Sequence, residues 1–187
     1  TSGYRRSGIT TDGATDMRVA NCTFRGWLNT VNSRSCVVRG VLYHNTFINC
    51  GVGAEQPAAD AGKAINNLFY NVTTARMTGT WAAGSGYNAT DSASLSYTVT
   101  GGATGDRLSQ TFTFEDSANG DYRLTSSDAG AQGYGVDLSG DGTYPVTLDQ
   151  TGTTRPDPPS IGAYEPTGGG GPDLKSASDS LTLTLTD

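Results

Sequence analysis

Short runs of β-branched and aromatic residues, broken by Gly and Asn, fill the first half of the chain. The stretch RSCVVRGVLYHNTFINC, residues 34–50, is rich in Val, Tyr, Phe, Thr and Ile and is punctuated by Gly and Asn. The first group of residues favours strands, and Gly and Asn favour the bends between strands. The pattern therefore predicts short strands and fits helical spacing poorly.

One aromatic position recurs at a nearly constant interval. Phe24 lies in NCTFRG, Phe47 in NTFINC and Phe69 in NLFYNV, so the intervals are 23 and 22 residues. Periods in this range are typical of solenoids, in which each turn of chain stacks on the one before. We expect the three rings to form one internal file, with successive strands about 4.8 Å apart.

Polar side chains recur beside that aromatic in three further columns. Alignment on the phenylalanines gives the columns Cys22/Asn45/Asn67, Gly26/Asn49/Asn71 and Asn21/His44/Asn66. Asn tolerates the left-handed backbone of a sharp bend, and its amide can bond to the next turn of chain. The columns therefore predict corners, joined by a ladder of amides.

The repeated phrases NCTF, NTFINC and NLFYN resemble those of the right-handed parallel β-helix family. Pectate lyases, other polysaccharide-active enzymes, bacterial surface proteins and phage tailspikes share this architecture. A leucine-rich repeat has a similar period, but its Leu-x-x-Leu-x-Leu pattern is absent. The resemblance covers about residues 16–90 and implies an all-β, right-handed parallel β-helix with a C-terminal β cap. It does not imply an activity, because many functions share this scaffold.

The chain divides into three parts on this basis. We expect coils over residues 1–90, a cap with irregular strands over 91–166, and a linker with a strand-like tail over 167–187. The runs SLSYTVT and TFTFED are predicted to be strands that leave the stack.

The cap rests on a second resemblance. Asp121–Leu124 (DYRL), Arg155-Pro156 and Ile161–Glu165 (IGAYE) are similar to the closing segment of many secreted β-helix proteins. This resemblance implies a fold that covers the open end of the solenoid, without a ligand. The tail SLTLTLTD, residues 180–187, alternates Leu with Thr. It could dock on this domain, begin another one, add to a neighbouring subunit's sheet or simply fray.

Composition and charge narrow the class of protein. The 187 residues include 26 glycines, 35% hydrophobic and 16% charged side chains, as expected for one compact domain with many turns. The net charge of −6 divides into +4 over residues 1–90 and −10 over the rest. The basic half could face an acidic polysaccharide or carry scattered solvated charges, whereas a nucleic-acid binder would show a denser basic patch.

The ends of the sequence bear on its origin. No run of about 18 apolar residues is present, so we expect no membrane span, and the first residues lack a secretory signal. The chain begins at Thr1 without an initiator Met. We therefore expect a processed product or a piece of a longer protein, with the upstream part of the same chain or neighbouring subunits as partners.

The sequence has few features of a metal site or of reactive cysteines. Cys22, Cys36 and Cys50 are 14 residues apart without a Cys-x-x-Cys pair, which makes a zinc site improbable and favours small core thiols. We expect no cofactor. Residues 137–142 (DLSGDG) have some character of a calcium loop, but Leu148 replaces the Glu expected at position 12, so an Asp-Gly turn is the default.

Candidate catalytic groups do not form a clear site. The coil region offers four carboxylates, Asp12, Asp16, Glu55 and Asp60, which share no column. A glycosidase would need two of them about 5–10 Å apart, and Asp16 with Asp60 is the only candidate pair. Pectate lyases use an Arg base beside calcium-binding acids. Here Arg39 aligns with Asp16, and an ion pair between the two is a simpler explanation than a catalytic base. His44 lies in the column of Asn21 and Asn66, which indicates a corner residue. We expect no catalytic residue.

Sugar contact is the remaining candidate function. Arg25, Arg39, Lys63 and Tyr70 are predicted glycan-binding residues, with Arg25, Ile48 and Tyr70 forming an outward strip. The aromatic residues expected on the flank are Trp27, Tyr43, Tyr70, Trp81 and Tyr87. Packing of these side chains against a loop is the competing interpretation.

Together these features favour a non-catalytic structural or adhesion module of a larger extracellular or virion-surface protein, such as a phage tail- or capsid-associated β-helix protein. A homotrimer is expected in the phage-like case. The alternative is a polysaccharide lyase or glycoside hydrolase whose catalytic coils lie upstream or are shared between subunits.

Overall fold

Every regular element of the protein is a β-strand in the part of the chain that the structure describes. The structure is a computed structural model, and it describes residues 6–10, 17–26, 33–57 and 62–166. Over these residues no helix is long and apolar enough to cross a membrane. The tail and linker predicted for residues 167–187 lie outside the described residues.

Three parallel sheets contain most of the strands. The first comprises β1 (Arg6–Thr10), β4 (Ser33–Val37), β7 (Val52–Glu55) and β10 (Ala75–Thr78). The second comprises β2 (Met17–Ala20), β5 (Gly40–Tyr43) and β8 (Ala64–Ile65). The third comprises β3 (Thr23–Arg25), β6 (Thr46–Ile48), β9 (Leu68–Tyr70) and β12 (Ala89–Thr90).

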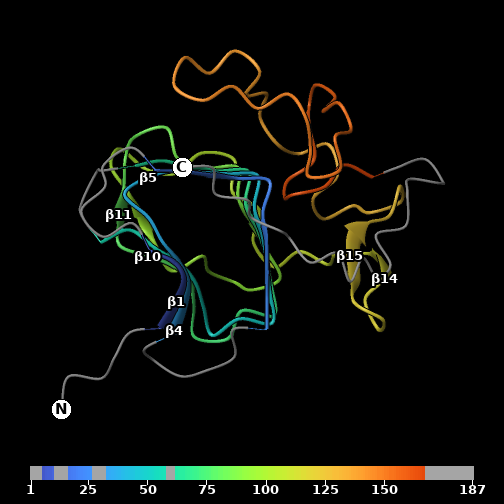
Figure 1. The fold of residues 1–187 in the computed structure, drawn as a ribbon, viewed down its shortest axis with the longest axis horizontal. Coiled ribbons are helices and arrows are strands. Elements are labelled where there is room, and N and C mark those ends of the chain that lie inside the picture. The colour runs from blue at the N-terminus through green and yellow to red at the C-terminus, as the bar shows by residue number, and fades with distance from the viewer. Residues whose placement is uncertain (1–5, 11–16, 27–32, 58–61, 167–187) are drawn as a thin grey trace, which may run out of the picture.

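The chain visits the three sheets in turn and then repeats the same route. One circuit is β1, β2 and β3, the next is β4, β5 and β6, and the third is β7, β8 and β9. Figure 1 shows these circuits lying over one another around a common interior. This stacking of parallel strands is consistent with a β-solenoid. We call the stacked circuits, residues 6–110, the coil stack.

The predicted file of phenyl rings is confirmed. Phe24, Phe47 and Phe69 pair in register across β3, β6 and β9. Successive ring centroids are 4.8 Å apart, with interplanar angles of 6° and 4°. The rings are 8%, 0% and 0% exposed, so the file forms the centre of the interior core.

Parallel pairing continues past residue 90. β11 (Thr80–Trp81) pairs in parallel with β13 (Thr98–Val99), and further parallel bridges join Gly86 to Thr104 and Ala89 to Arg107. The expectation that SLSYTVT leaves the stack is therefore wrong. These strands are only two residues long and lack the repeated phenylalanine, which is why the repeat is difficult to see in the sequence.

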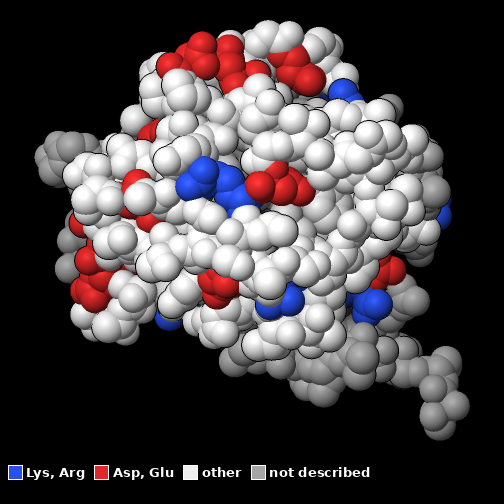
Figure 2. Space-filling view, turned by 180° about the vertical axis from the view of Figure 1, so that it is seen from behind, with Lys and Arg blue, Asp and Glu red and all other residues white. Residues whose placement is uncertain are grey.

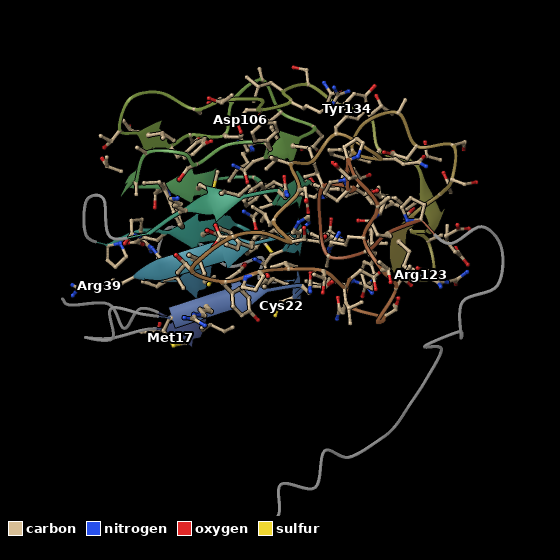
Figure 3. All side chains as sticks on the ribbon, turned by 90° about the horizontal axis from the view of Figure 1, so that it is seen from above. Met17, Cys22, Arg39, Asp106, Arg123 and Tyr134 are labelled. Carbon is tan, nitrogen blue, oxygen red and sulfur yellow. The ribbon has the colours of Figure 1, made fainter. Side chains whose placement is uncertain are left out.

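The remaining described residues, 111–166, form what we call the flanking segment. It begins with an antiparallel hairpin of β14 (Phe114–Asp116) and β15 (Asp121–Leu124), followed by loops with isolated antiparallel bridges. Figures 1 and 3 show it beside the coil stack, across the layers.

Hydrogen bonds show that the flanking segment covers the side of several circuits. Its backbone and side chains bond to Asn21 in the first circuit, to Thr46 in the second and to Asn66 in the third. The expectation of a cap over one open end is therefore not met by this segment. Apolar side chains such as Val41 and Leu68 recur on the outer faces of the β2-β5-β8 and β3-β6-β9-β12 sheets, and the flanking segment covers them.

Three apolar clusters follow from this arrangement. The first fills the interior of the coil stack. The second lies between the β3-β6-β9-β12 sheet and the flanking segment, where Leu68 and Ala89 meet Phe112 and Ile161. The third lies over the β2-β5-β8 sheet and includes Val41, Tyr43, Ile65, Leu138 and Val146. The flanking segment thus buries the outer side of two sheets.

The cysteines mostly match the prediction of core thiols. All three are free, with Cys36 and Cys50 buried and Cys22 half-buried. Burial raises the pKa of the Cys36 thiol to about 12, so it stays protonated and unreactive near neutral pH.

Candidate functional site

A ladder of buried amides runs through the interior beside the phenyl file. The Asn45 side chain donates to Asn67 Oδ1 over 3.0 Å, and the Asn67 side chain donates to Asn88 Oδ1 over 2.9 Å. The same oxygens accept the backbone N–H groups of Asn45 and Asn67, and Asn45 Oδ1 accepts that of Cys22. The three asparagines are fully buried. The ladder predicted for the Cys22, Asn45 and Asn67 column is confirmed and extends to Asn88.

The ladder ends on a carboxylate. Asp106 Oδ1 accepts the Asn88 backbone N–H over 2.9 Å, and Asp106 Oδ2 accepts the Tyr97 hydroxyl over 2.5 Å. Burial raises the pKa of Asp106, against the effect of these hydrogen bonds. Burial, with the adjacent carboxylate, also raises the pKa of Tyr97. An ionised carboxylate only accepts hydrogen bonds, so it has no amide donor for a further circuit.

Positive-φ residues mark the predicted corners. One column holds Asn21, His44, Asn66 and Tyr87 at φ of 54°, 52°, 59° and 54°, and another holds Gly26, Asn49 and Asn71 at 76°, 52° and 51°. Asn adopts this left-handed region more readily than most residues because its short side chain bonds locally. Two of the three predicted corner columns are therefore confirmed, whereas Cys22, Asn45 and Asn67 are not among the positive-φ residues.

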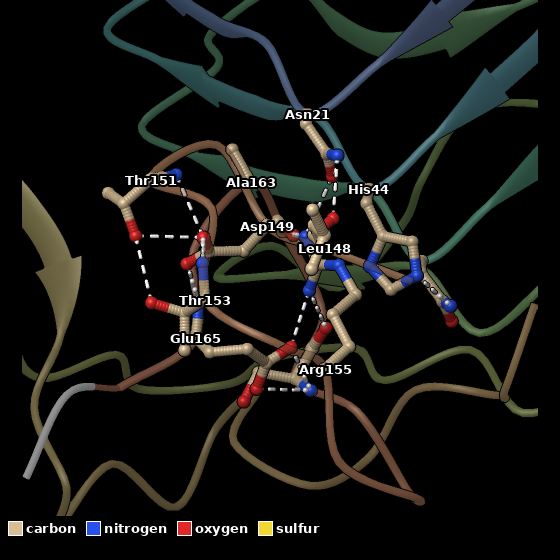
Figure 4. A network of polar contacts seen from close by, with 12 residues as sticks. Asn21, His44, Leu148, Asp149, Thr151, Thr153, Arg155, Ala163 and Glu165 are labelled. Carbon is tan, nitrogen blue, oxygen red and sulfur yellow. Dashed lines mark hydrogen bonds and ion pairs between the residues drawn. The ribbon is translucent and has the colours of Figure 1, made fainter. Parts of the chain in front are cut away.

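A buried polar network ties the flanking segment to the first corner column, as Figure 4 shows. Arg155 forms an ion pair with Glu165, and these side chains are 3% and 4% exposed. Arg155 Nη2 also donates to Asn21 Oδ1 over 2.9 Å. The Glu165 carboxylate accepts the Ser160 backbone N–H, and the Glu165 N–H donates to Asp149 Oδ2 over 2.9 Å. Arg155 and Glu165 thus hold the loop between them against the coil stack.

The phrase IGAYE contacts the coil stack directly through its glycine. Gly162 has φ of 108°, and a Cβ placed there would lie 2.8 Å from Thr46 Oγ1. The next residue, Ala163, donates its N–H to that hydroxyl over 2.9 Å. Only glycine combines this backbone conformation with so close an approach.

His44, the only histidine, lies beneath this network. Its Nε2 is 2.9 Å from Asn66 Nδ2, which donates, so the neutral ring carries its proton on Nδ1. Burial, and next the positive charge of Arg155, holds the pKa of His44 well below its usual range, and carbonyls of Gly162 and Ser160 partly oppose this shift. The ring is 0% exposed. His44 is therefore a neutral corner residue, inaccessible to a substrate.

Of two predicted glycan-binding residues near the hairpin, Tyr70 is half-buried against it and Arg25 is exposed at its side. Arg25, Ile48 and Tyr70 align in register as expected. However, Ile48 is fully buried, and Tyr70 contacts Phe114 edge-on at 5.0 Å between ring centroids. The Arg25 guanidinium lies 5.0 Å from the centroid of the Tyr122 ring. Ile48 and Tyr70 are therefore covered, as in the interpretation of packing against a loop, whereas Arg25 stays exposed beside the Tyr122 ring.

The other two predicted glycan-binding residues lie elsewhere. Arg39 is half-buried at the bend between β4 and β5, and Figure 3 shows it at an edge of the coil stack. Lys63 is half-buried just before β8 and faces Asp141. Burial raises the pKa of Asp141, but backbone hydrogen bonds from Tyr144 and Thr143 and the charge of Lys63 lower it overall. The four residues do not converge on one site, and their binding to glycans stays a prediction.

Carboxylates in the described residues serve mainly as turn caps and ion-pair partners. Glu55 pairs with Arg34, whereas Asp12, Asp16 and Asp60 lie outside the described residues. In the predicted calcium loop, Asp137 accepts the Ser139 N–H and Asp141 accepts those of Thr143 and Tyr144. No cluster of three or more potential metal ligands occurs within the described ranges.

Several aromatics expected on the flank lie inside the protein. Tyr43 and Trp81 are 0% exposed, so their prediction as exposed aromatics is wrong. Trp81 packs in the interior core, and Tyr43 packs under the flanking segment, where burial and the nearby Asp141 raise its pKa to about 12. Tyr87 is half-buried, and Trp27 lies outside the described residues.

Sequence reasoning missed a set of arginine–tyrosine pairs that joins the two regions. In each pair an Arg of the coil stack lies against a Tyr of the flanking segment. The pairs are Arg18 with Tyr144 at 5.2 Å, Arg25 with Tyr122 at 5.0 Å and Arg107 with Tyr134 at 3.3 Å, measured from Cζ to ring centroid. Each brings together residues far apart in the sequence, so no local pattern could reveal it.

Charge on the visible surface is mixed. Figure 2 shows acidic and basic side chains interspersed over one face, without a single dense basic patch on that face. No protein-family model, curated protein or solved structure matches the chain. Its function must therefore be inferred from its own residues.

Proposed function

We propose that the coil stack is a right-handed parallel β-helix. The successive circuits, the phenyl file and the amide ladder support this assignment. The hand follows from a general rule, because connections between parallel strands of one sheet are right-handed in almost all known proteins.

We further propose that the chain is a non-catalytic structural or adhesion module of a larger extracellular or virion-surface protein. The observation that carries this proposal is the use of the repeated polar residues. Asn45, Asn67 and Asn88 bond to one another and to backbone groups inside the stack, and all three are fully buried. The repeated chemistry of the chain thus holds circuits together and is inaccessible to a substrate.

Glycan turnover tests this proposal. The full chain is incubated with acidic and neutral polysaccharides, with and without calcium, and new reducing or unsaturated ends are measured. We expect none, while circular dichroism shows a folded β protein. Turnover that disappears in Arg39→Ala would contradict the proposal and favour a lyase or hydrolase.

Oligomer mass tests the form of assembly. Light scattering on the full chain and on a chain lacking residues 168–187 compares their masses. A trimer that becomes a monomer on deletion supports assembly of a virion type through the tail. A monomer in both cases favours a cell-surface module.

A further inference from the structure

The first circuit of the coil stack is more exposed than the second. In β2, Met17 and Ala20 are half-buried and Arg18 is exposed, whereas their partners in β5 are all buried. Among the described strands β2 pairs only with β5, so its other edge has no strand partner there. Figure 3 shows Met17 and Cys22 at this end of the coil stack, opposite Asp106. Because Met17 packs against the interior core, the open edge of β2 lies beside apolar side chains.

The direction of the amide ladder restricts what can pair with this edge. Each asparagine donates its backbone N–H and its side chain to the Oδ1 of the next circuit, as Asn45 does to Asn67. A circuit stacked below the first one would need such an acceptor at Cys22. That residue offers only a thiol, a weak acceptor, which donates to the Ala20 carbonyl. An asparagine below it would keep buried donors unsatisfied, so the edge suits a strand without asparagine.

The tail of the chain, which lies outside the described residues, has this character. Its run SLTLTLT, residues 180–186, contains no asparagine and alternates Leu with Thr, so a strand places its leucines on one face. In β2 the interior side chains are Met17 and Val19, and Arg18 is exposed between them. Residues 172–187 carry three Asp and one Lys, a net charge of −2, opposite in sign to that of Arg18. The apolar face and the charge of the tail are thus both complementary to β2.

The described chain ends close to β2. Arg155 pairs with Glu165 and also donates to Asn21, the corner residue that follows β2, as Figure 4 shows. Thirteen residues, 167–179, then separate the described chain from SLTLTLT. A random coil of that length spans about 20 Å, and a strand of four residues is about 13 Å long. The tail is therefore long enough to reach β2 of its own molecule, where tethering gives an effective concentration in the millimolar range.

We propose that residues 180–186 pair as a strand with the open edge of β2 in the same molecule. The leucines cover Met17 and Val19, and the threonines face outward beside Arg18. This pairing provides partners for the outward backbone groups of β2 and shields a sheet edge that could otherwise pair with other chains. It involves one chain only and does not rest on the proposed function.

Amide hydrogen exchange in the full chain tests the pairing. The Asn21 N–H donates to the Tyr43 carbonyl, and N–H groups alternate in direction along a strand, so those of Arg18 and Ala20 point away from β5. We expect both amides to be protected in the wild type. Leu183→Ser removes the central leucine of the tail and should speed their exchange about tenfold.

A matched variant on the other face of the tail separates pairing from a general effect. Thr184→Ser should leave exchange at Arg18 and Ala20 within about twofold of the wild type, because Thr184 faces outward in the proposed strand. The Leu42 N–H, which donates to the Lys63 carbonyl over 2.8 Å, checks the fold and should keep its protection in both variants.

Three results would overturn the assignment. The first is rapid exchange of the Arg18 and Ala20 amides in the wild type, and the second is equal exchange in Leu183→Ser and Thr184→Ser. The third is protection that rises with protein concentration together with the mass measured by light scattering, which would assign the edge to a second copy of the chain. Protection that is independent of concentration and lost only in Leu183→Ser supports the pairing within one molecule.

Discussion

The coil stack and the flanking segment satisfy their buried polar groups in two different ways. In the coil stack the same amide column recurs, so Asn45, Asn67 and Asn88 bond to like neighbours. In the flanking segment, buried polar groups are instead satisfied by charged residues that occur once, such as the buried ion pair of Arg155 and Glu165. The first region therefore shares its stabilisation over many circuits, whereas the second depends on a few side chains.

The largest expected loss comes from the phenyl file. Phe47→Ala removes the middle ring, which stacks on both neighbours and is 0% exposed. The cavity should lower the free energy of unfolding by about 4 kcal/mol. Denaturant unfolding measures it, with Phe114→Ala in the half-buried hairpin as the comparison. A greater loss from Phe114→Ala would reverse the ranking of the two regions.

The next loss should come from the buried ion pair. Arg155→Ala leaves the Glu165 charge buried, at an expected cost of about 3 kcal/mol. The matched control is Arg123→Ala, whose ion pair with Asp121 has side chains 22% and 21% exposed and should contribute under about 1 kcal/mol.

Hydrogen exchange locates the effect of Arg155→Ala. Amides of residues 147–165 should exchange faster, while those of the amide ladder keep their protection. A uniform loss of protection in the coil stack and the flanking segment would contradict the view that the two regions are stabilised by separate side chains.

A smaller loss is expected from one rung of the ladder. Asn67→Ala deprives the Asn45 backbone N–H and side chain of a buried acceptor, which should cost about 2 kcal/mol. The control is Asn119→Ala, which removes an exposed amide from the hairpin turn and should change stability by under about 0.5 kcal/mol. Urea unfolding distinguishes these values, and equal midpoints for the two variants would argue against the ladder as a source of stability.

The smallest effect depends on pH and acts at the junction of the two regions. His44 is neutral when folded because its pKa is lowered, and it faces Asn66, Arg155 and the Ser160 and Gly162 carbonyls. Below its ordinary pKa of about 6.5 the unfolded chain binds a proton that the folded chain does not. Stability should therefore fall as pH drops below that value, by at most about 1.4 kcal/mol per pH unit.

His44→Asn isolates this effect, because Asn21 and Asn66 already occupy the same corner column with positive φ. Unfolding free energies between pH 7 and 5 should then lose the histidine slope. An undiminished slope in His44→Asn would assign the pH dependence to other groups.

Sequence periodicity predicted the coil stack well but only up to its third circuit. Phe24, Phe47 and Phe69 recur with a nearly constant spacing, and stacking places them in one file. The next ladder steps, from Asn67 to Asn88 and then to Asp106, shorten to 21 and 18 residues. The repeated phenylalanine is absent there, because Thr90 pairs with Phe69. The sequence pattern therefore ends one circuit before the stacked strands do.

The flanking segment could not be placed from the sequence in the same way. The contact of Arg155 with Asn21 spans 134 residues, and that of Ala163 with Thr46 spans 117. In each contact the partner from the flanking segment occurs once, without a repeat to align. The resemblance identified the phrases around Arg155 and Glu165, but not the surface they cover. The exposed pair of Arg107 and Tyr134 was missed for the same reason.

Nuclear Overhauser contacts between phenylalanine rings give the most direct test of the stacked circuits. In a chain with ring-labelled phenylalanine, Phe47 should show contacts to both Phe24 and Phe69, because the centroids are 4.8 Å apart on either side. Phe24 and Phe69 should show none with each other. Absence of both Phe47 contacts, or rings freely accessible to a soluble paramagnetic probe, would contradict the stacked arrangement.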